Sequence, residues 1–443
     1  MEIKNICVIG MGFIGTTLAA VLAEAGFVVF GVEKDKEKLE LLKQAKPHFH
    51  ENGLPEVLAD QLNKNLFIFD KIPEGRKIDA FVISVATPVD EETKKPDLSH
   101  VKSAVQDLLP YLEEGQLVML RSTVPVGTTR KIVLQILQEK CQNVRLSFCP
   151  ERTVEGRALE ELKTLPQIIG ALNEESGNLS SKIFSQITPA IVRTSSLEAA
   201  EIIKLINNSY RDFNFAFANQ TALICKSLGL DANEVVEAAN FGYNRSNVLH
   251  AGFVASGKAG FVGGVCLEKD PYILSNSSNA DTSLIKAARE LNQGLVKHVF
   301  ERAVAHLKEK NIYLENANIF ISGFAFKGRP ETDDMRGSPA IQLLDFFKKS
   351  GVKEMHGHDF VVKPKNIEKL GVKVCSLEDA FKVADVLVFM NNHKGYNDIS
   401  IGSLAKNMKE DALLFDGWQI FSDKLRDSNI NYESIGFKKN RVA

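Results

Sequence analysis

The side chain with the clearest chemical potential is Cys266, in the segment Gly263-Gly264-Val265-Cys266-Leu267-Glu268-Lys269-Asp270. Glycines clear space for a ligand, and a nearby cation such as Lys269 favours the reactive thiolate form of a cysteine. Asp270 follows the thiol by four residues, where its carboxylate could assist a water molecule. The segment predicts a nucleophilic loop cysteine next to a helix start. Taken alone, it also fits a buried thiol beside a helix cap.

Lys204 and Asn208 form a second candidate group. They stand four residues apart in a stretch with helical periodicity, so they share one face of the expected helix. A lysine and an asparagine on one face can stabilise a developing oxyanion. The alternative is an ordinary solvated helix face.

A nucleotide-binding turn is expected at Gly10-Met11-Gly12-Phe13-Ile14-Gly15, between a strand and a helix. The three glycines permit a tight turn, close approach of a pyrophosphate and close helix–strand packing. The pyrophosphate would lie on the N–H groups at the helix N-terminus. Glu33 ends the next expected strand, where an acid accepts from ribose hydroxyls and repels a 2′-phosphate, which favours NAD over NADP.

Strands and helices alternate twice along the chain, on either side of a helical section. Apolar strands are expected at residues 5–9, 27–32, 66–69, 80–85, 117–120 and 144–148. Residues 198–228 and 283–308 show only helical periodicity, and alternation resumes at residue 318. We therefore expect an α/β protein of three domains. They are an N-terminal Rossmann-type doubly wound parallel sheet (1–197), a central helical domain carrying the Cys266 loop (198–310), and a smaller C-terminal Rossmann-like α/β domain (311–443).

The composition excludes several classes of function. The 443 residues carry a formal net charge of −2, which gives no broad basic surface for nucleic acid or an anionic membrane. No stretch approaches the ~20 apolar residues of a membrane helix, and no signal-peptide core is seen, so a cytoplasmic location is expected. The six cysteines form no CxxC pair and no Cys/His cluster, which predicts reduced thiols and no metal site.

Further motifs extend this pattern, and with them the chain resembles the UDP-glucose/GDP-mannose dehydrogenase family over nearly its whole length. The motifs appear in the family's order. They are Gly10–Gly15, Val85-Ala86-Thr87-Pro88-Val89, Ser122-Thr123-Val124-Pro125-Val126-Gly127, Pro150-Glu151, Lys204-x-x-x-Asn208, Gly263-Gly264-x-Cys266-x-x-Lys269-Asp270, Gly323-Phe324-Ala325-Phe326-Lys327 and Thr332-Asp333-Asp334-x-Arg336.

The resemblance implies an NAD-dependent, four-electron oxidation of the C6 alcohol of a UDP-linked sugar to the uronate. Cys266 would be the nucleophile of a thiohemiacetal and then a thioester. The other implied catalytic residues are the oxyanion stabilisers Lys204 and Asn208, the water-positioning pair Asp270 and Thr123, and the general base or water-orienting acid Glu151.

The resemblance also implies the ligand contacts. The expected cofactor contacts are Gly10, Gly12, Phe13, Ile14, Gly15, Glu33, Lys38, Thr87, Thr123 and Arg336. The expected substrate contacts are Glu151, Lys204, Asn208, Arg245, Gly263 and Lys327. A homodimer built through the helical domain, or a higher homo-oligomer, is expected by analogy.

The chain departs from the common family pattern at Pro150-Glu151-Arg152-Thr153, where Pro-Glu-Phe is frequent. This variant is similar to branches that act on N-acetylated or otherwise modified UDP sugars. The sequence identifies neither the sugar nor, beyond the resemblance, the choice of UDP over GDP. The competing interpretations are a single-step NAD-dependent 3-hydroxyacid or 6-phosphogluconate-type dehydrogenase and a non-catalytic sugar-nucleotide sensor. Cys266 and the second α/β domain after Ala317 argue against the single-step dehydrogenase, and Cys266, Lys204, Asn208 and Asp270 together argue against the sensor.

Overall fold

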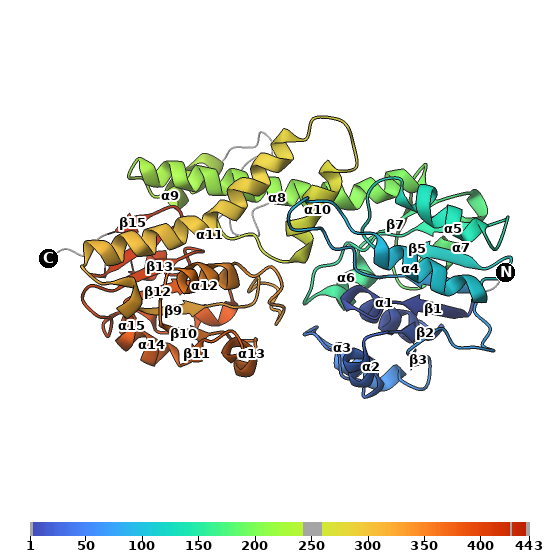
Figure 1. Cartoon of the computed structure of the whole chain (residues 1–443), viewed down its shortest axis with the longest axis horizontal. Helices are drawn as coiled ribbons and strands as arrows, with labels where there is room; N and C mark the ends of the chain where they lie inside the picture. Colours follow the sequence, from blue (N-terminus) through green and yellow to red (C-terminus); the bar gives the residue numbers. More distant parts are fainter. Residues whose placement is uncertain (1–2, 242–258, 426–427, 440–443) are drawn as a thin grey trace. The chain divides into compact units, whose positions relative to one another are not determined.

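The computed structural model describes residues 3–241, 259–425 and 428–439 (Figure 1). The chain divides into two compact units. One contains the residues up to Asn207 together with Tyr272–Ala280, and the other contains Asn208–Pro271 and the chain from Asp281 onward. Helices α8 (Leu197–Ser227) and α10 (Val265–Ser275) each run from one unit into the other.

The first unit is built on an eight-stranded sheet in the order β3-β2-β1-β4-β5-β6-β7-β8. Strands β1 to β6 are parallel and have the 3-2-1-4-5-6 order of dinucleotide-binding sheets, whereas β7 runs antiparallel to β6. The strands are β1 (Asn5–Ile9), β2 (Val28–Val32), β3 (Leu66–Phe69), β4 (Ala80–Ile83), β5 (Leu117–Leu120), β6 (Arg145–Phe148), β7 (Gln167–Ala171) and β8 (Ile191–Arg193).

Helices cover both faces of this sheet because its strands are apolar on both sides. Ile6 and Val8 of β1 belong to one buried cluster, and Cys7 and Ile9 to another. Helices α1, α3, α6 and α7 contribute to the first cluster, and α4 and α5 to the second. The helices are α1 (Phe13–Glu24), α2 (Lys36–Lys43), α3 (Leu54–Gln61), α4 (Ser99–Leu108), η1 (Leu109–Tyr111), η2 (Thr129–Val133), α5 (Leu134–Gln138), α6 (Ala158–Thr164) and α7 (Glu174–Phe184).

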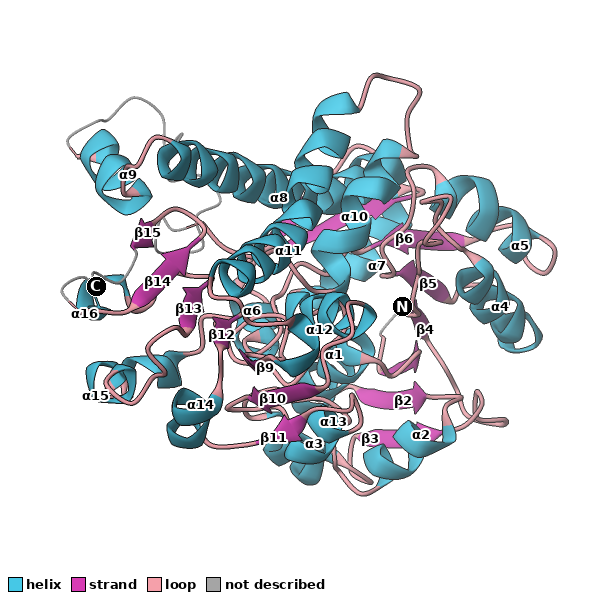
Figure 2. Cartoon of the chain, turned by 60° about the vertical axis from the view of Figure 1, so that its left-hand side comes forward, coloured by secondary structure: helices cyan, strands magenta, loops and turns pink. Residues whose placement is uncertain are grey.

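The second unit repeats the strand order of the first. Its seven-stranded sheet runs β11-β10-β9-β12-β13-β14-β15, parallel except for β15. Figure 2 shows its strands in magenta. The strands are β9 (Asn318–Ser322), β10 (Glu354–His358), β11 (Lys373–Val374), β12 (Val386–Phe389), β13 (Leu413–Asp416), β14 (Asn431–Ser434) and β15 (Lys438–Lys439).

The remaining helices belong to the helical region or to the second sheet. In the helical region they are α8, α9 (Ala232–Asn240), α10 and α11 (Ser283–Glu309). Those of the second sheet are η3 (Leu314–Asn316), α12 (Pro339–Lys349), α13 (Pro364–Glu368), α14 (Leu377–Val383), η4 (Lys394–Asn397), α15 (Ile401–Ala405) and α16 (Ser422–Leu425). The predicted fold class is confirmed: two mainly parallel α/β sheets with a helical region between them along the chain.

One local prediction was wrong. Cys266 is not a loop residue but the second residue of helix α10. Gly264, with φ of 87°, ends the glycine segment, and the Glu268 N–H donates to its carbonyl to start the helix. The nearby Pro271 obscured this helix in the sequence, because proline usually breaks a helix interior.

Candidate active site

The turn after β1 has the geometry that a bound dinucleotide requires. Gly10 adopts φ of 91°, and a Cβ there would lie 2.6 Å from the Ser84 carbonyl oxygen. A Cβ at Gly15 would lie 1.9 Å from the Gly10 carbonyl oxygen, so α1 and the turn can pack this closely only around glycine. A Cβ at Gly12 would meet nothing within 4 Å, which leaves the helix N-terminus, with Phe13 and Ile14, open to a phosphate.

Glu33 lies directly after β2, beside this turn. Its carboxylate accepts from the Met11 N–H at 3.2 Å and from the Asp35 N–H at 2.9 Å. Asp35 caps α2 and pairs with Lys38 at 3.6 Å. The carboxylate of Glu33 is therefore tied to the glycine turn, and its negative charge fits an unphosphorylated adenosine ribose. These residues fit NAD.

Two threonines meet at the carboxyl ends of the neighbouring strands. Thr87, after β4, is buried and donates to the carbonyl oxygen of Thr123, after β5, at 2.6 Å. Ser122 joins the same strand ends, because its hydroxyl donates to Val85 O and accepts from Val85 N. In parallel sheets of this order, ligands bind at this edge, next to the point where the strand order reverses.

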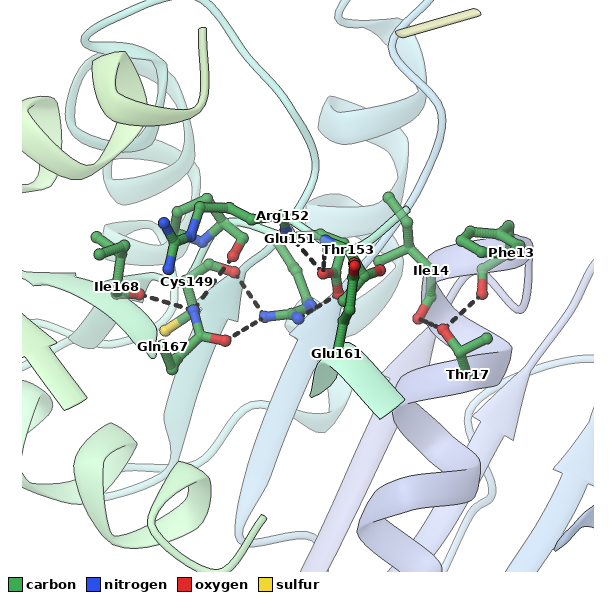
Figure 3. A network of polar contacts seen from close by, with 12 residues as sticks. Phe13, Ile14, Thr17, Cys149, Glu151, Arg152, Thr153, Glu161, Gln167 and Ile168 are labelled. Carbon is green, nitrogen blue, oxygen red and sulfur yellow. Dashed lines mark hydrogen bonds and ion pairs between the residues drawn. The ribbon is translucent and has the colours of Figure 1, made fainter. Parts of the chain in front are cut away.

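Glu151, after β6, is buried and fixed from three sides (Figure 3). The Arg121 guanidinium bonds one carboxylate oxygen, and the N–H groups of Arg152 and Thr153 donate to the other at 2.7 Å each. Burial on its own raises the pKa of Glu151, but the charge of Arg121, the Thr153 N–H and the charge of Lys204 together bring the pKa below its usual value. Glu151 is therefore a carboxylate at neutral pH and accepts hydrogen bonds.

Arg121 is as buried as the acid that it holds. It is 1% exposed, and its Nη1 donates to the carbonyl of Cys149 and to the side-chain oxygen of Gln167, both at 3.0 Å. The sequence analysis did not identify this arginine. Its position directly before Ser122-Thr123, at the carboxyl end of an apolar strand, was the available signal.

Helix α8 carries Lys204 and Asn208, which are 8% and 6% exposed. Neither is a solvated face residue, so the simpler interpretation of this pair does not hold. One turn earlier, Glu201 accepts from the Gly127 N–H and from the N–H and hydroxyl of Thr129, at 2.5 to 2.8 Å. These bonds join α8 to the turn that follows Thr123.

Cys266, Asp270 and Asn208 come together in the second unit. The Cys266 thiol is exposed in the first turn of α10, and Asp270, one turn later, is fully buried. The Asn208 amide donates to one oxygen of Asp270 at 2.5 Å, and Lys269 pairs with the other at 2.8 Å. A helix N-terminus favours a thiolate. The geometry therefore offers a nucleophile beside a fixed carboxylate and an amide.

The remaining substrate and cofactor candidates lie near β9 and α12. Lys327 stands 5.3 Å from the ring centroid of Phe326. Arg336 is exposed and makes a two-point pair with Asp334, with its shortest contact at 2.6 Å. Gly263 packs so closely that a Cβ would lie 2.7 Å from the Gly337 carbonyl oxygen. Arg245 lies outside the described residues.

The remaining features of the described residues concern metal-ligand groups, membrane-spanning helices and the burial of the cysteines. Within residues 3–241, 259–425 and 428–439, no group of three or more His, Cys, Asp or Glu side chains could hold a metal ion. Over the same ranges, no helix is long and apolar enough to cross a bilayer. Cys7, Cys141, Cys149 and Cys225 are buried, as expected for small apolar side chains.

Three family profiles match successive parts of the chain. The profiles of the UDP-glucose/GDP-mannose dehydrogenase family match with their NAD binding domain at residues 4–188, their central domain at 198–294 and their UDP binding domain at 320–423. Together they cover most of the sequence, including every predicted catalytic residue.

Individual proteins agree with the profiles. The UDP-N-acetyl-D-mannosamine dehydrogenase of Methanococcus vannielii is 32% identical over 99% of this chain and 96% of its own length. The structure of a UDP-D-ManNAc dehydrogenase from Pyrococcus horikoshii is 28% identical, covers 98% of this chain and 99% of its own, and superposes with a TM-score of 0.86.

A third relative has a different named sugar. The NDP-N-acetyl-D-galactosaminuronic acid dehydrogenase of Methanosarcina mazei is 27% identical, covers 99% of this chain and 96% of its own, and has a TM-score of 0.78. The chain belongs to the UDP-glucose/GDP-mannose dehydrogenase family and is an NAD-dependent nucleotide-sugar dehydrogenase.

Proposed function

We propose that the protein oxidises the C6 alcohol of a UDP-N-acetylhexosamine to the carboxylate through a thioester on Cys266. The observation that carries this proposal is the exposed thiol at the start of α10, one turn before a buried carboxylate held by Asn208. The overall reaction consumes one alcohol, two NAD⁺ and one water, and gives one carboxylate, two NADH and three protons. A single-step dehydrogenase needs no such thiol.

The thiol has two tasks in this reaction. NAD, when bound, accepts a hydride in each of the two oxidations. After the first, the Cys266 sulfur adds to the C6 aldehyde, so that the aldehyde stays bound as a thiohemiacetal. After the second, the same sulfur is the leaving group when water attacks the thioester. Lys204 and Asn208 stabilise the oxyanions of these tetrahedral species through charge and hydrogen bonding.

The water that attacks the thioester needs acceptors that hold it. Asp270 is ordered by Asn208 and Lys269, and Glu151 is ordered by Arg121 and two backbone N–H groups. We propose that these two carboxylates orient the water and receive its proton, with the Thr123 hydroxyl as a relay. Because Arg121 stabilises its charged form, Glu151 is better suited to orienting water than to donating a proton.

The two sheets divide the binding of the two ligands. We propose that segment 1–197 binds NAD through the glycine turn, Glu33, Lys38 and Thr87, and that segment 311–443 binds the UDP group with Lys327. Arg336 would contact the cofactor pyrophosphate, and Gly263 and Arg245, in the helical segment 198–310, would contact the substrate. Lysine and arginine provide the charge-assisted hydrogen bonds that diphosphates require.

The sugar is proposed to carry an acetamido group at C2. The relatives from Methanococcus vannielii and Pyrococcus horikoshii are named for UDP-N-acetyl-D-mannosamine, and the one from Methanosarcina mazei for a galactosamine-derived sugar. UDP-N-acetyl-D-mannosamine is therefore the first substrate to test. The Pro150-Glu151-Arg152 variant also favours a modified sugar over UDP-glucose.

A homodimer is proposed through helix α8. Its exposed side includes Tyr210, Phe217 and Ile224, which are 55%, 43% and 53% exposed and repeat every seven residues. A regular apolar stripe of this kind is typical of a helix that packs on a second copy. Light scattering of the purified protein should give twice the mass of one chain. Tyr210→Asp combined with Phe217→Asp should lower the measured mass to that of a single chain.

The proposed reaction is tested by NADH formation with UDP-N-acetyl-D-mannosamine, UDP-N-acetyl-D-galactosamine, UDP-glucose and GDP-mannose. We expect two NADH per UDP-N-acetylhexosamine and a fall in kcat of about 1,000-fold in Cys266→Ser. Cys375→Ser is the matched control and should retain wild-type turnover. One NADH per sugar, or an active Cys266→Ser variant, would replace the thioester mechanism by a single-step dehydrogenase.

A further inference from the structure

Helix α10 has a gap in its backbone hydrogen bonding directly after the thiol. Residue 271 of a regular helix would donate its N–H to the carbonyl of Leu267, four residues earlier, but Pro271 has no N–H. Arg289 of α11 supplies the donor instead, with its Nη1 2.8 Å from the Leu267 oxygen. Leu267 follows Cys266 in the chain, so Arg289 holds the backbone next to the thiol.

Arg289 is itself fixed by a buried acid on α8. Its Nη1 lies 2.7 Å from an oxygen of Asp212, and both side chains are 1% exposed. Asp212 is one turn beyond Asn208, so Lys204, Asn208 and Asp212 form a single series at four-residue spacing on α8. Asn292 of α11 donates to the same Asp212 oxygen and to the Asp212 carbonyl, both at 2.8 Å.

The network reaches the other side of the thiol as well. The Asn219 amide donates to the Asn292 oxygen at 3.0 Å, and the Gly260 N–H donates to the Asn219 oxygen at 2.9 Å. Asn219 and Asn292 are 0% and 2% exposed. Gly260 and Leu267 bracket Cys266, so one buried network on α8 and α11 fixes both ends of the segment that carries the thiol.

We infer that Arg289, held by Asp212, is a positioning residue for Cys266. It stabilises the proline-interrupted turn of α10 so that the thiol stays at the helix N-terminus, at a fixed offset from Asp270. Asp270 of α10 is hydrogen-bonded to Asn208 of α8. Leu267 of α10 is linked to Asp212 of α8 through Arg289. Helix α10 therefore has two polar links to α8. The inference rests on the proposed role of Cys266, because only a reacting thiol needs this alignment. A displacement of about 1 Å can lower a rate about 100-fold.

The test uses the fact that Pro271→Ala restores the missing N–H. Arg289→Met is combined with Asp212→Asn, so that no unpaired carboxylate is left buried. With UDP-N-acetyl-D-mannosamine, this Arg289→Met/Asp212→Asn pair should lower kcat about 100-fold and leave the KM for NAD unchanged. In the Pro271→Ala background the same pair should lower kcat less than about threefold, because α10 then satisfies the Leu267 carbonyl itself. An equal loss in both backgrounds would overturn the inference.

A second measurement does not depend on turnover. Alkylation of Cys266 by iodoacetamide, quantified on its peptide by mass spectrometry, should slow about tenfold in the Arg289→Met/Asp212→Asn pair. Arg302→Met is the matched control: Arg302 is also on α11, pairs with Glu433 at 2.6 Å, and leaves Glu433 paired with Lys226. It should leave the alkylation rate unchanged. Equal slowing in both variants would show that the effect is not specific to the Arg289–Asp212 pair and would overturn the inference. An active Cys266→Ser enzyme would instead refute the proposed function while the alkylation result still reports on the network.

Discussion

The two sheets use the same turn after their first strand. Gly10 follows β1 with φ of 91°, and Gly323 follows β9 with φ of 94°. A Cβ would lie 2.6 Å from the Ser84 carbonyl oxygen in the first case and 2.8 Å from the Asn391 backbone nitrogen in the second. In both sheets the first strand can pass this closely to the end of its neighbour only at a glycine.

The acid after the second strand is also shared. Glu33 accepts from the Met11 N–H at 3.2 Å, and Asp359 accepts from the Ala325 N–H at 3.0 Å. The sheets differ in the element that comes after the turn. In the first, α1 begins at Phe13 and offers helix N–H groups, whereas in the second the described residues 324–338 form no helix and α12 begins only at Pro339.

This difference separates two ways of binding a diphosphate on one backbone plan. The first sheet offers backbone N–H groups and a helix dipole, so glycine is needed and side-chain charge is not. For the second, we propose that Lys327, which lies on a loop, supplies side-chain charge in place of the helix. On this proposal, strand order sets where a ligand binds, and the residues after the first strand set how the ligand is held.

The largest expected effect comes from adding a methyl group at the glycine that follows the first strand of each sheet. Gly10→Ala should raise the Kd for NAD at least about 100-fold and leave the Kd for UDP unchanged, and Gly323→Ala should do the reverse. Each alanine meets backbone atoms and adopts a positive φ, a strain of about 1–3 kcal/mol. Calorimetric titration of each variant with NAD and with UDP measures both dissociation constants. If either variant lost both ligands equally, the sheets would not divide the binding.

A smaller effect should follow from removing the side-chain charge in the second sheet. Lys327→Ala should weaken UDP binding about 10- to 100-fold, since hydrogen bonds to charged groups contribute about 1.5–3 kcal/mol. The difference should shrink as salt is raised, and NAD binding should not change. Lys349→Ala, on the exposed end of α12, is the control. Unchanged UDP affinity in Lys327→Ala would show that Lys327 does not bind the diphosphate.

The smallest effect concerns two buried acids at strand ends, Glu151 after β6 and Asp416 in β13. The pKa of Glu151 is lowered, so its stabilising contribution is complete above its ordinary value of 4.5 and is lost as the pH falls through the folded-state value. Burial raises the pKa of Asp416, and backbone N–H groups offset this only partly. Its contribution is therefore present at low pH and is lost as the pH rises through its ordinary value of 3.8 and then its folded-state value.

Urea unfolding between about pH 3.5 and pH 7 compares these two acids. The stability advantage of wild type over Glu151→Gln should grow with pH, and its advantage over Asp416→Asn should shrink with pH. The direction of each change follows from the direction of the pKa shift, because stability is lost where the folded chain disfavours the protonation state that the unfolded chain adopts. If the two advantages changed with pH in the same direction, Arg121 would not be what distinguishes these sites.

Much of the fold could be predicted from the sequence because its signals are local. The sequence predicts strand β1 at residues 5–9, β3 at 66–69 and β5 at 117–120, with the bounds that the structure has. Each is a short apolar run bounded by polar or glycine residues. Strands β7, β8 and β14 were not predicted. Each begins or ends with a polar residue, namely Gln167, Arg193 and Asn431, and each is the last or next-to-last strand of its sheet.

The sequence by itself determined the residue types that the proposed chemistry needs: the glycine turn with Glu33, the thiol of Cys266, and Lys204 and Asn208 at helical spacing. Spacing along one strand or helix is enough to place such groups. Only the tertiary structure decided which residues hold them: Arg121 against Glu151, and Arg289 against Leu267. These pairs join residues 30 and 22 positions apart. A buried charge has to find its partner across the fold, because the low-dielectric interior leaves it no water, and no local pattern specifies that partner.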